Sequence, residues 1–280
     1  MSVKIRKANG QLEEFDPQKL KNSLKRSGAS NSEAEAVYKL VAPYIKNKVS
    51  TNYIYSLSHK FLRNINRRSF FLYSLKKAML KLGPAGYTFE QYFADLMKAY
   101  GFKTETNLTL KGKCIRHEID VLGTKHNLVV SVECKYHSNA QRASDAKVAL
   151  YVHSRFKDLE NVLKKRYLKP NYEGWLVTNT RLTIDAINYA SCMNFKAISW
   201  NYPQEYSLKK MIEDKKLYPV TILSGIKARL SDKLIKNNII LIKDIIPIDT
   251  KTLMSMLDIT QKKAELIKQH SESLYSLKTE

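Results

Sequence analysis

The run from Leu128 to Lys135 constrains the fold more than any other part of the chain, because it is typical of a short β-strand that ends in charged residues. Successive side chains of a strand point to opposite faces of the sheet. Glu133 and Lys135 are therefore expected to emerge together on one face. The other face would carry the side chains that enter a core, namely Leu128, Val130, Val132 and Cys134.

A second apolar strand contains Asp120, which Ile119 and Val121 flank in the same alternation. Residues 123–127 are interpreted as the hairpin loop between the two strands. Asp120, Glu133 and Lys135 would then converge. Two acidic oxygens can hold a hard cation such as Mg²⁺, and a lysine can orient the attacking water or neutralise a scissile phosphate. A strand ending in Glu-x-Lys can also be a solvated edge that holds no metal.

A helix is predicted before these strands. Thr88 followed by Gln91 is interpreted as a capping box. Glu90 lies beside an apolar stripe and can reach the ends of the strands if that stripe packs on the sheet. Its alternative role is that of a first-turn glutamate that is favourable to the helix dipole. The stripe recurs at helical spacing through Phe89, Phe93, Leu96, Met97 and Tyr100.

Four segments follow one another in a recognisable order: GYTFEQYF at 86–93, HEIDV at 117–121, VECK at 132–135 and GWLVTNT at 174–180. Together with the helical run at 184–193 they resemble the restriction-endonuclease-like fold with a PD-(D/E)XK site, in its Mrr-type branch. The resemblance covers residues 86 to about 201. It implies an α/β/α domain with a mixed sheet and a DNA-cleaving activity.

By this resemblance Asp120, Glu133 and Lys135 occupy the metal-binding and catalytic positions, with the metal on Asp120 and Glu133, and Glu90 is the helix acid. Mg²⁺ is the expected ion, with Mn²⁺ as an alternative. Two departures from the family are visible. Glu133 stands where many Mrr-type members carry glutamine, and no proline precedes Asp120.

The charge of the chain favours a polyanionic partner. Forty-eight Lys and Arg against 26 Asp and Glu give a formal net charge of +22. Such an excess concentrates nucleic acid at the surface through counterion release. Residues 1–85 hold 17 of the basic and five of the acidic side chains. Because basic proteins of unrelated function are common, the charge predicts DNA or nucleotide binding only together with the motifs.

The first segment is typical of a hairpin followed by helices. Residues 3–10 are interpreted as a strand entering an Asn-Gly turn, and residues 11–15 as the returning strand. Asp16 is a fitting N-cap with Pro17 at the first helical position, and Gly28 is expected to stop this helix.

This segment resembles the ATP-cone domain over about 80 residues, through Val3, Lys4, Lys7, Gly10, Phe15-Asp16, Lys19-Leu20 and Ser23-Leu24, then residues 50–55 and 67–79. The family binds ATP or dATP as an allosteric signal, and a triphosphate needs converging cations. Tyr55 stands where several members carry histidine. The expected nucleotide-binding residues are Val3, Lys4, Arg6, Lys7, Lys19 and Tyr55. The sequence has no Walker-type glycine loop, so we do not expect this segment to hydrolyse the nucleotide.

The last part of the chain is helical, with amphipathic runs at 226–235, 239–246 and 253–268. Residues 252–267 loosely resemble a helix-hairpin-helix without its hairpin glycines. DNA contact and a packing or dimerisation role are the two interpretations. The three cysteines form no C-x-x-C pair, so a structural zinc site is not expected.

The sequence therefore predicts an α/β (α+β) protein of three domains: an ATP-cone at 1–84, a nuclease domain at 86–203 and a small helical domain at 216–275. We expect a cytoplasmic homo-oligomer without a membrane span. The expected function is a nucleotide-controlled, Mg²⁺-dependent DNA endonuclease, with restriction or phage defence implied by family analogy alone. One alternative is an inactive, nucleotide-responsive DNA-binding regulator. In another, the first domain contacts DNA rather than a nucleotide.

Overall fold

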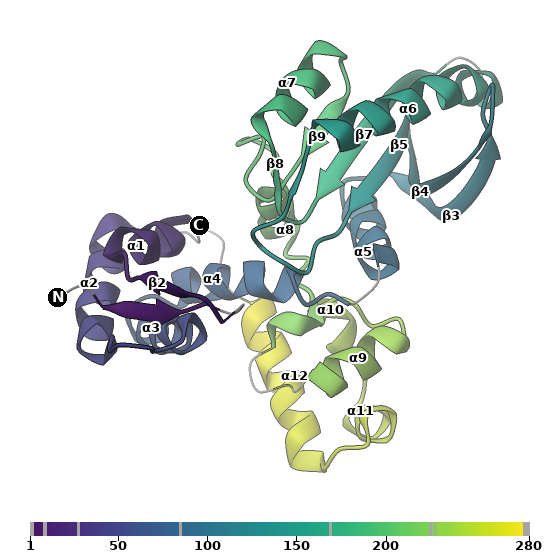
Figure 1. Ribbon diagram of the computed structural model, residues 1–280. Coiled ribbons are helices and arrows are strands. Elements are labelled where there is room, and N and C mark those ends of the chain that lie inside the picture. Colours follow the sequence, from purple (N-terminus) through teal and green to yellow (C-terminus); the bar gives the residue numbers. More distant parts are fainter. Residues whose placement is uncertain are drawn as a thin grey trace. The chain divides into compact units, whose positions relative to one another are not determined.

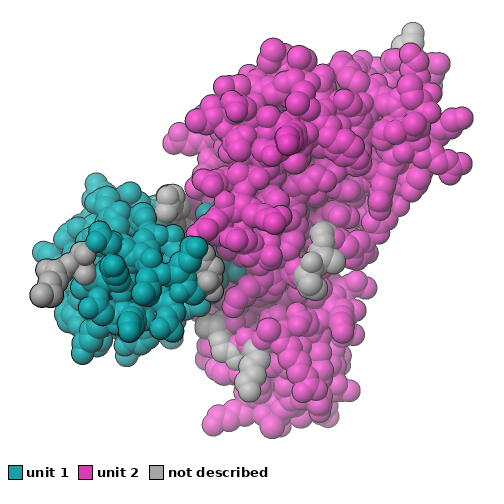
Figure 2. All heavy atoms as spheres, viewed as in Figure 1, with its two compact units in different colours: residues 1–77 teal, residues 78–280 magenta. Residues whose placement is uncertain are grey.

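The structure is a computed structural model that describes residues 3–7, 10–26, 29–83, 86–167, 170–223, 226 and 228–276. Its contacts divide into two compact units, residues 1–77 and 78–280, which Figure 2 shows in teal and magenta. Helices and a five-stranded mixed sheet confirm the predicted α/β (α+β) class. The second unit contains both the predicted nuclease domain and the predicted C-terminal helical domain. No helix in the described ranges is long and apolar enough to cross a membrane.

The first unit is a hairpin followed by helices, as the sequence predicted. The Asp16 carboxylate accepts a hydrogen bond from the Gln18 backbone N–H at 2.8 Å and so caps the first helix. The predicted turn residues Ala8 and Asn9, and the predicted helix stop at Gly28, lie outside the described residues. The elements are β1 (Lys4–Arg6), β2 (Leu12–Glu14), α1 (Pro17–Arg26), α2 (Asn31–Val41), the 3₁₀ helix η1 (Ala42–Tyr44), α3 (Thr51–Ile65) and α4 (Arg67–Met79).

The second unit is built on a five-stranded sheet in the order β3-β4-β5-β7-β9. The first three strands pair antiparallel and the last three pair parallel. These strands are β3 (Lys103–Lys111), β4 (Arg116–Lys125), β5 (Leu128–Lys135), β7 (Asn171–Thr178) and β9 (Lys196–Ile198). Two short strands, β6 (Ala143–Ser144) and β8 (Arg181–Leu182), form a separate parallel pair.

Helices α5 (Gly86–Ala99) and α6 (Ala146–Arg166) cover opposite faces of this sheet, and α7 (Ile184–Cys192) packs beside α6 (Figure 1). Ile119 and Val129 of the sheet pack against Leu159 of α6. The close approach of α6 to β7 requires Gly174, because a Cβ there would lie 2.1 Å from the Phe156 ring. The predicted apolar stripe of α5 is buried from Phe89 to Met97.

Three local predictions are wrong. Helix α5 already includes Gly86, so Thr88 lies inside the helix and forms no capping box. Strand β4 continues to Lys125, which leaves only His126, in a left-handed conformation, and Asn127 as the turn. Strand β5 does not alternate between core and solvent, because its second face is also covered and Glu133 is buried. Strands with helices on both faces carry near-continuous buried runs.

The C-terminal helices are α8 (Leu208–Lys215), the 3₁₀ helix η2 (Val220–Ile222), α9 (Ala228–Lys236), α10 (Ile242–Ile245), α11 (Thr250–Leu257) and α12 (Gln261–Tyr275). The amphipathic run at 253–268 forms parts of two helices, because Asp258 adopts a left-handed conformation that ends α11. Hydrogen bonds from two side-chain hydroxyls are among the contacts that tie this region to the rest of its unit. The Tyr92 hydroxyl donates to the Leu217 carbonyl at 2.6 Å, and Thr221 Oγ1 donates to the Ala78 carbonyl at 2.8 Å.

Candidate active site

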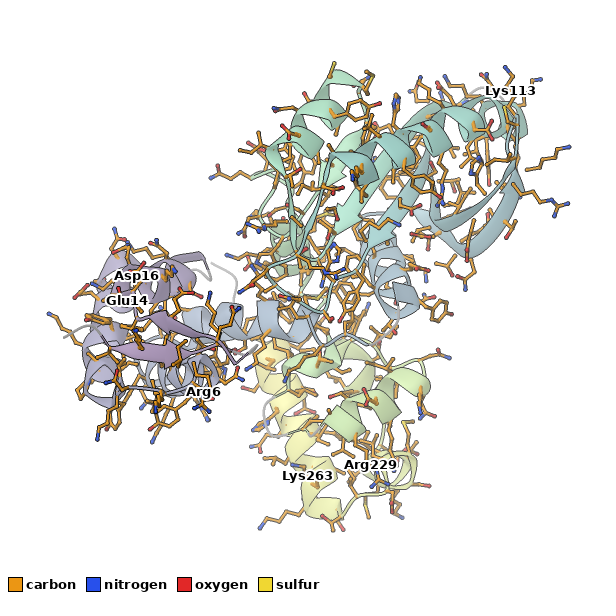
Figure 3. The ribbon with its side chains drawn as sticks, in the orientation of Figure 1. Arg6, Glu14, Asp16, Lys113, Arg229 and Lys263 are labelled. Carbon is orange, nitrogen blue, oxygen red and sulfur yellow. The ribbon has the colours of Figure 1, made fainter. Side chains whose placement is uncertain are left out.

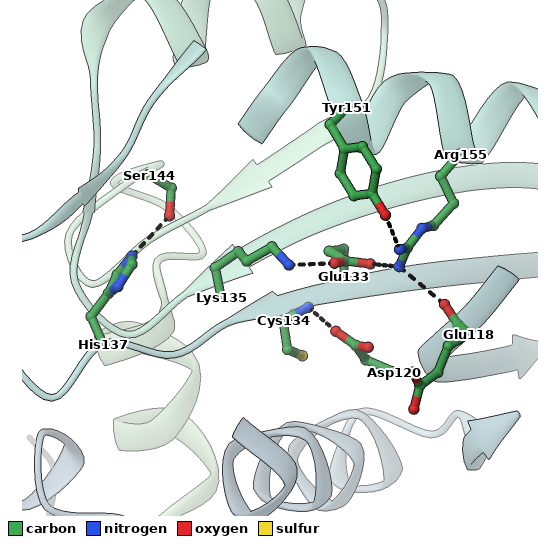
Figure 4. A network of polar contacts seen from close by, with 9 residues as sticks. All are labelled: Glu118, Asp120, Glu133, Cys134, Lys135, His137, Ser144, Tyr151 and Arg155. Atoms are coloured by element: carbon green, nitrogen blue, oxygen red, sulfur yellow. Dashed lines mark hydrogen bonds and ion pairs between the residues drawn. The ribbon is translucent and has the colours of Figure 1, made fainter. Parts of the chain in front are cut away.

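The pairing of β4 with β5 brings Asp120 beside Glu133. The pairing ends with Val121 opposite Val132, and Asp120 and Glu133 are the next residues on the two strands. The backbone N–H of Cys134 donates to Asp120 Oδ2 at 2.7 Å (Figure 4). The structure thus brings together the two strand carboxylates that the sequence placed at one site.

Glu133 is held by two cations. Lys135 Nζ donates to Glu133 Oε1 at 2.5 Å, and Arg155 Nη1 forms an ion pair with Glu133 Oε2 (Figure 4). Only 4% of the Glu133 side chain is exposed. A buried carboxylate is stable only when it is paired and hydrogen-bonded, and α6 supplies the second partner on the face that it covers.

Arg155 is the residue of this site that the sequence interpretation missed. It lies in α6, whose first turn is capped by the Asp145 carboxylate. Besides Glu133, its guanidinium donates to the Glu118 carbonyl at 3.0 Å and to the hydroxyl of Tyr151. The spacing of Tyr151 and Arg155, four residues apart on one helix face, was the only available sequence signal, and it does not point to Glu133.

Burial, followed by the charge of Glu133, raises the pKa of Asp120 to about 7, although the hydrogen bond from the Cys134 N–H opposes this rise. Burial also raises the pKa of Glu90, with further contributions from the charges of Glu118 and Glu133. Glu90 is therefore electrostatically coupled to the strand carboxylates from α5. Four carboxyl groups meet in this region, and Glu118 is the one that the sequence did not single out.

The donor chemistry of these side chains fits a hard divalent cation. The raised pKa values of Asp120 and Glu90 reflect burial and neighbouring negative charge that a cation would offset. Within the described ranges, no group of three or more His, Cys, Asp or Glu side chains is arranged to hold a metal ion. Mg²⁺ is commonly bound by one or two carboxylates while it retains several waters. Asp120 and Glu133 are the two strand carboxylates that could hold such an ion.

The segment that follows Lys135 is fixed by a buried asparagine. Asn179 Oδ1 accepts a hydrogen bond from the His137 N–H at 2.8 Å, and Asn179 Nδ2 donates to the His137 carbonyl at 2.8 Å. The Tyr136 hydroxyl donates to the Leu80 carbonyl at 2.8 Å. These bonds fix the backbone immediately after Lys135, so the Lys135 side chain reaches Glu133 from a fixed backbone position.

The structure divides the residues predicted to bind a nucleotide into separate groups. Lys7 and Lys19 both form ion pairs with Glu13. Their hydrogen bonds, with Lys19 contributing most, lower the pKa of Glu13 to about 2. Lys4 and Arg6 are exposed and flank the buried Ile5, so strand alternation directs them to the other face of the hairpin (Figure 3 labels Arg6). Val3 contributes its carbonyl, which accepts from the Phe15 N–H at 2.8 Å.

Tyr55, the last predicted nucleotide residue, belongs to an aromatic group of α3 and α4. Lys77 Nζ lies 3.7 Å from the centre of the Tyr55 ring, which stacks on His59 at 5.8 Å between ring centroids. His59 Nε2 is 2.5 Å from Ser74 Oγ. Burial lowers the pKa of His59 to about 4, with added repulsion from Lys77 and Arg63. This ring is therefore neutral at physiological pH.

Comparison with known proteins identifies a family. Residues 218–275 match the family model described as AF1548-like, C-terminal. An uncharacterized protein of Archaeoglobus fulgidus is 33% identical over 153 residues, which are 55% of this chain and 83% of that protein. The chain belongs to the AF1548-like family. The crystal structure of AF1548, a protein of unknown function, matches with a TM-score of 0.56 at 28% identity, over 68% of this chain and 98% of that one.

A repair endonuclease from Pyrococcus abyssi aligns with 38% of this chain and 42% of its own, at 23% identity and a TM-score of 0.27. That similarity is too weak to assign an activity. The two AF1548-like relatives carry no assigned activity either, so the function of the chain has to be inferred from its site. The ATP-cone and Mrr-type resemblances stay predictions.

The AF1548-like C-terminal region carries an open groove of about 970 Å³ between α9, α11 and α12. Its lining residues are Leu230, Lys251, Met254, Ser255, Asp258, Ile259, Thr260 and Lys263. Figure 3 shows Arg229 and Lys263 in this region. Asp258, at the end of α11, adopts a left-handed conformation, which is most common for glycine. DNA contact by this region stays a prediction.

Proposed function

We propose that this chain is a metal-dependent DNA endonuclease whose reacting groups are Asp120, Glu133 and Lys135, with Glu90 assisting. The observation that supports it most strongly is the meeting of mutually repelling carboxylates beside a lysine ammonium at the end of β5. The net charge of +22 supports a polyanionic substrate.

In the proposed reaction, a water oxygen bonds to phosphorus as the bond from phosphorus to a sugar oxygen breaks. Mg²⁺ or Mn²⁺ on Asp120 and Glu133 would lower the pKa of water and stabilise charge on the scissile phosphate. Lys135 orients the attacking water or neutralises a phosphate oxygen. Glu90, whose pKa is raised, is suited to accept the proton that the water loses. The leaving sugar oxygen takes a proton from solvent.

Nicking of supercoiled plasmid in Mg²⁺ tests this proposal, with Lys135→Ala as the variant. We expect its rate to fall about a hundredfold or more, as for the loss of a group that stabilises transition-state charge. Lys98→Ala is the matched control, because Lys98 also pairs with an acidic residue, Asp95 at 2.8 Å, but on the exposed surface of α5. Equal rates for wild type and Lys135→Ala would remove the catalytic assignment.

The first unit is proposed to sense ATP or dATP and so control cleavage. The convergence of Lys7 and Lys19 on Glu13 supports it, because a triphosphate could replace that carboxylate between the two ammonium groups. Millimolar ATP or dATP is expected to raise the melting temperature of wild type but not of Lys19→Ala. Lys21→Ala is the control, since Lys21 is on the same helix and pairs with Glu35 at 2.6 Å. No shift in wild type would leave DNA contact as the role of this unit. A role in restriction or phage defence rests on the family resemblance alone.

A second candidate is a DNA-binding regulator without catalysis. The observation that favours it is that both carboxylate oxygens of Glu133 are already bound by cations. Calorimetric titration with Mg²⁺ in the presence of duplex DNA separates the two candidates. Metal binding that Asp120→Asn abolishes supports the endonuclease, whereas no binding supports the regulator.

A further inference from the structure

Arg155 is bound to one of the two Glu133 oxygens that a divalent cation could use. Its Nη1 pairs with Glu133 Oε2, while Lys135 binds Oε1. Each oxygen keeps a further lone pair, but a divalent cation that approaches it would meet two positive charges. Departure of one of these cations would relieve that repulsion, and the two differ in how readily they could leave.

The contacts of the two cations differ in how they could be replaced. Lys135 follows Glu133 by two residues on β5, in a segment that Asn179 fixes. Arg155 comes from a separate element, α6, and reaches the site through a long flexible side chain. Arg155 Nε is buried and, within the described residues, has no hydrogen-bond partner. The guanidinium is therefore incompletely satisfied in its present position.

The surroundings of Arg155 offer a direction for its movement. Its Nη2 donates to the hydroxyl of Tyr151, whose side chain is 56% exposed, and its guanidinium carbon is 5.0 Å from the centre of the Tyr151 ring. A small rotation about the side-chain bonds would carry the guanidinium from Glu133 toward the exposed side of Tyr151. A planar guanidinium matches a phosphate through paired hydrogen bonds.

The charges of the site make metal and phosphate binding interdependent. Glu133 is at present balanced by Lys135 and Arg155. A divalent cation added to this cluster introduces two positive charges, which an anionic DNA phosphate next to Arg155 would offset. Binding of either partner should then favour the other, and that is a reciprocal coupling free energy.

We propose that Arg155 is an exchangeable counter-ion: it holds Glu133 when the metal is absent and binds a DNA phosphate once a divalent cation takes its place. The inference rests on the proposed metal and DNA binding of this site but not on cleavage. Arg155 thus competes with the metal for Glu133 and also binds the substrate. The alternative is a static role, in which Arg155 only neutralises a buried carboxylate.

The test compares Arg155→Met with wild type in two binding measurements. Calorimetric titration of Mg²⁺ without DNA should give a dissociation constant about tenfold lower in the variant, because the competing charged hydrogen bond is gone. Fluorescence anisotropy of a labelled duplex in Ca²⁺ should give about tenfold weaker DNA binding. The slope of log Kd against log salt should fall by about one. In EDTA, where Glu133 would still hold Arg155, the variant should bind DNA as tightly as wild type does. A static counter-ion would instead weaken DNA binding to the same extent with and without Ca²⁺.

Arg166→Met is the matched control, because Arg166 is in the last turn of the same helix and lies over a neighbouring ring, Tyr167, at 5.7 Å. Neither measurement should change in this variant. If Arg155→Met fails to fold, Tyr151→Phe removes only the exposed hydroxyl that holds the guanidinium. It should shift both binding constants in the same directions by a smaller factor.

Unchanged Mg²⁺ and DNA affinities in Arg155→Met would overturn the inference, whether or not the wild type cleaves DNA. If Arg155→Met shows the expected changes in Mg²⁺ and DNA affinity while the wild type never nicks plasmid, the result would support Arg155 as the exchangeable counter-ion. It would contradict the endonuclease proposal. Equal weakening of both affinities would also overturn the inference, because it would indicate a structural role for Arg155.

Discussion

Glu13 in the first unit and Glu133 in the second each lie between two cations, and the two arrangements differ chiefly in burial. Glu13 lies between Lys7 and Lys19 with 27% of its side chain exposed, whereas Glu133 lies between Lys135 and Arg155 with 4% exposed. Exposed ion pairs contribute little to stability and are screened by salt. Buried pairs are costly to break because the remaining charge stays out of water. The same local chemistry therefore predicts ion pairs that are easily replaced in the first unit and ion pairs that are costly to break in the second.

The largest expected difference in the free energy of unfolding is that between Glu133→Gln and Glu13→Gln. Glu133→Gln leaves Lys135 and Arg155 without their buried counter-charge and should lower the free energy of unfolding by about 3–5 kcal/mol. Glu13→Gln should change it little. Far-UV circular dichroism during denaturant unfolding follows both variants, because each unit contains helices. Similar midpoints for the two variants would contradict the comparison.

Asp120→Asn is expected to stabilise the protein at alkaline pH. The folded-state pKa of Asp120 is raised to about 7 from 3.8, so the folded state binds more protons between those values and stability falls as pH rises through them. Replacing the Asp120 carboxyl group should raise the free energy of unfolding by roughly 2–4 kcal/mol at pH 8 and by less at pH 5. Melting temperatures of wild type and variant at the two pH values measure this. A variant less stable than wild type at pH 8 would show that folding does not raise the pKa of Asp120.

The smallest effect is expected from the acid titration of Glu13. Its pKa is depressed to about 2 from 4.5, so its ion pairs are fully present above about pH 4.5 and are lost as pH falls toward 2. The protection factors of amide hydrogens in the β1–β2 hairpin, which correct exchange rates for the intrinsic effect of pH, should fall over that range in wild type. In Glu13→Gln they should be low throughout and nearly constant with pH. High salt should have the same effect as low pH on the wild-type hairpin.

The sequence predicted the strand acids because their signals are local. Alternation around Asp120 and along β5 sufficed to place Asp120, Glu133 and Lys135 near one another. It misjudged the environment of Glu133, because the burial of that face depends on α6, which lies more than ten residues further along the chain. Arg155 was missed for the same reason, since no local pattern links residue 155 to residue 133.

The errors in element boundaries have equally specific causes. Asp258 breaks the run at 253–268 through a left-handed backbone conformation that the apolar periodicity does not encode. Lys125 extends β4 beyond Gly123 because strand pairing with β3 and β5 outweighs the turn preference of glycine. Strand pairing in three dimensions, rather than local preference, decided the end of β4.

The most direct test of the central claim is plasmid nicking in Mg²⁺ by Asp120→Asn at pH 8. The account predicts a loss of cleavage of about a hundredfold or more relative to wild type. Because the same variant is expected to be more stable at this pH, unfolding cannot explain that loss. Cleavage at the wild-type rate would contradict the account, since the carboxylate proposed to hold the metal would then be dispensable.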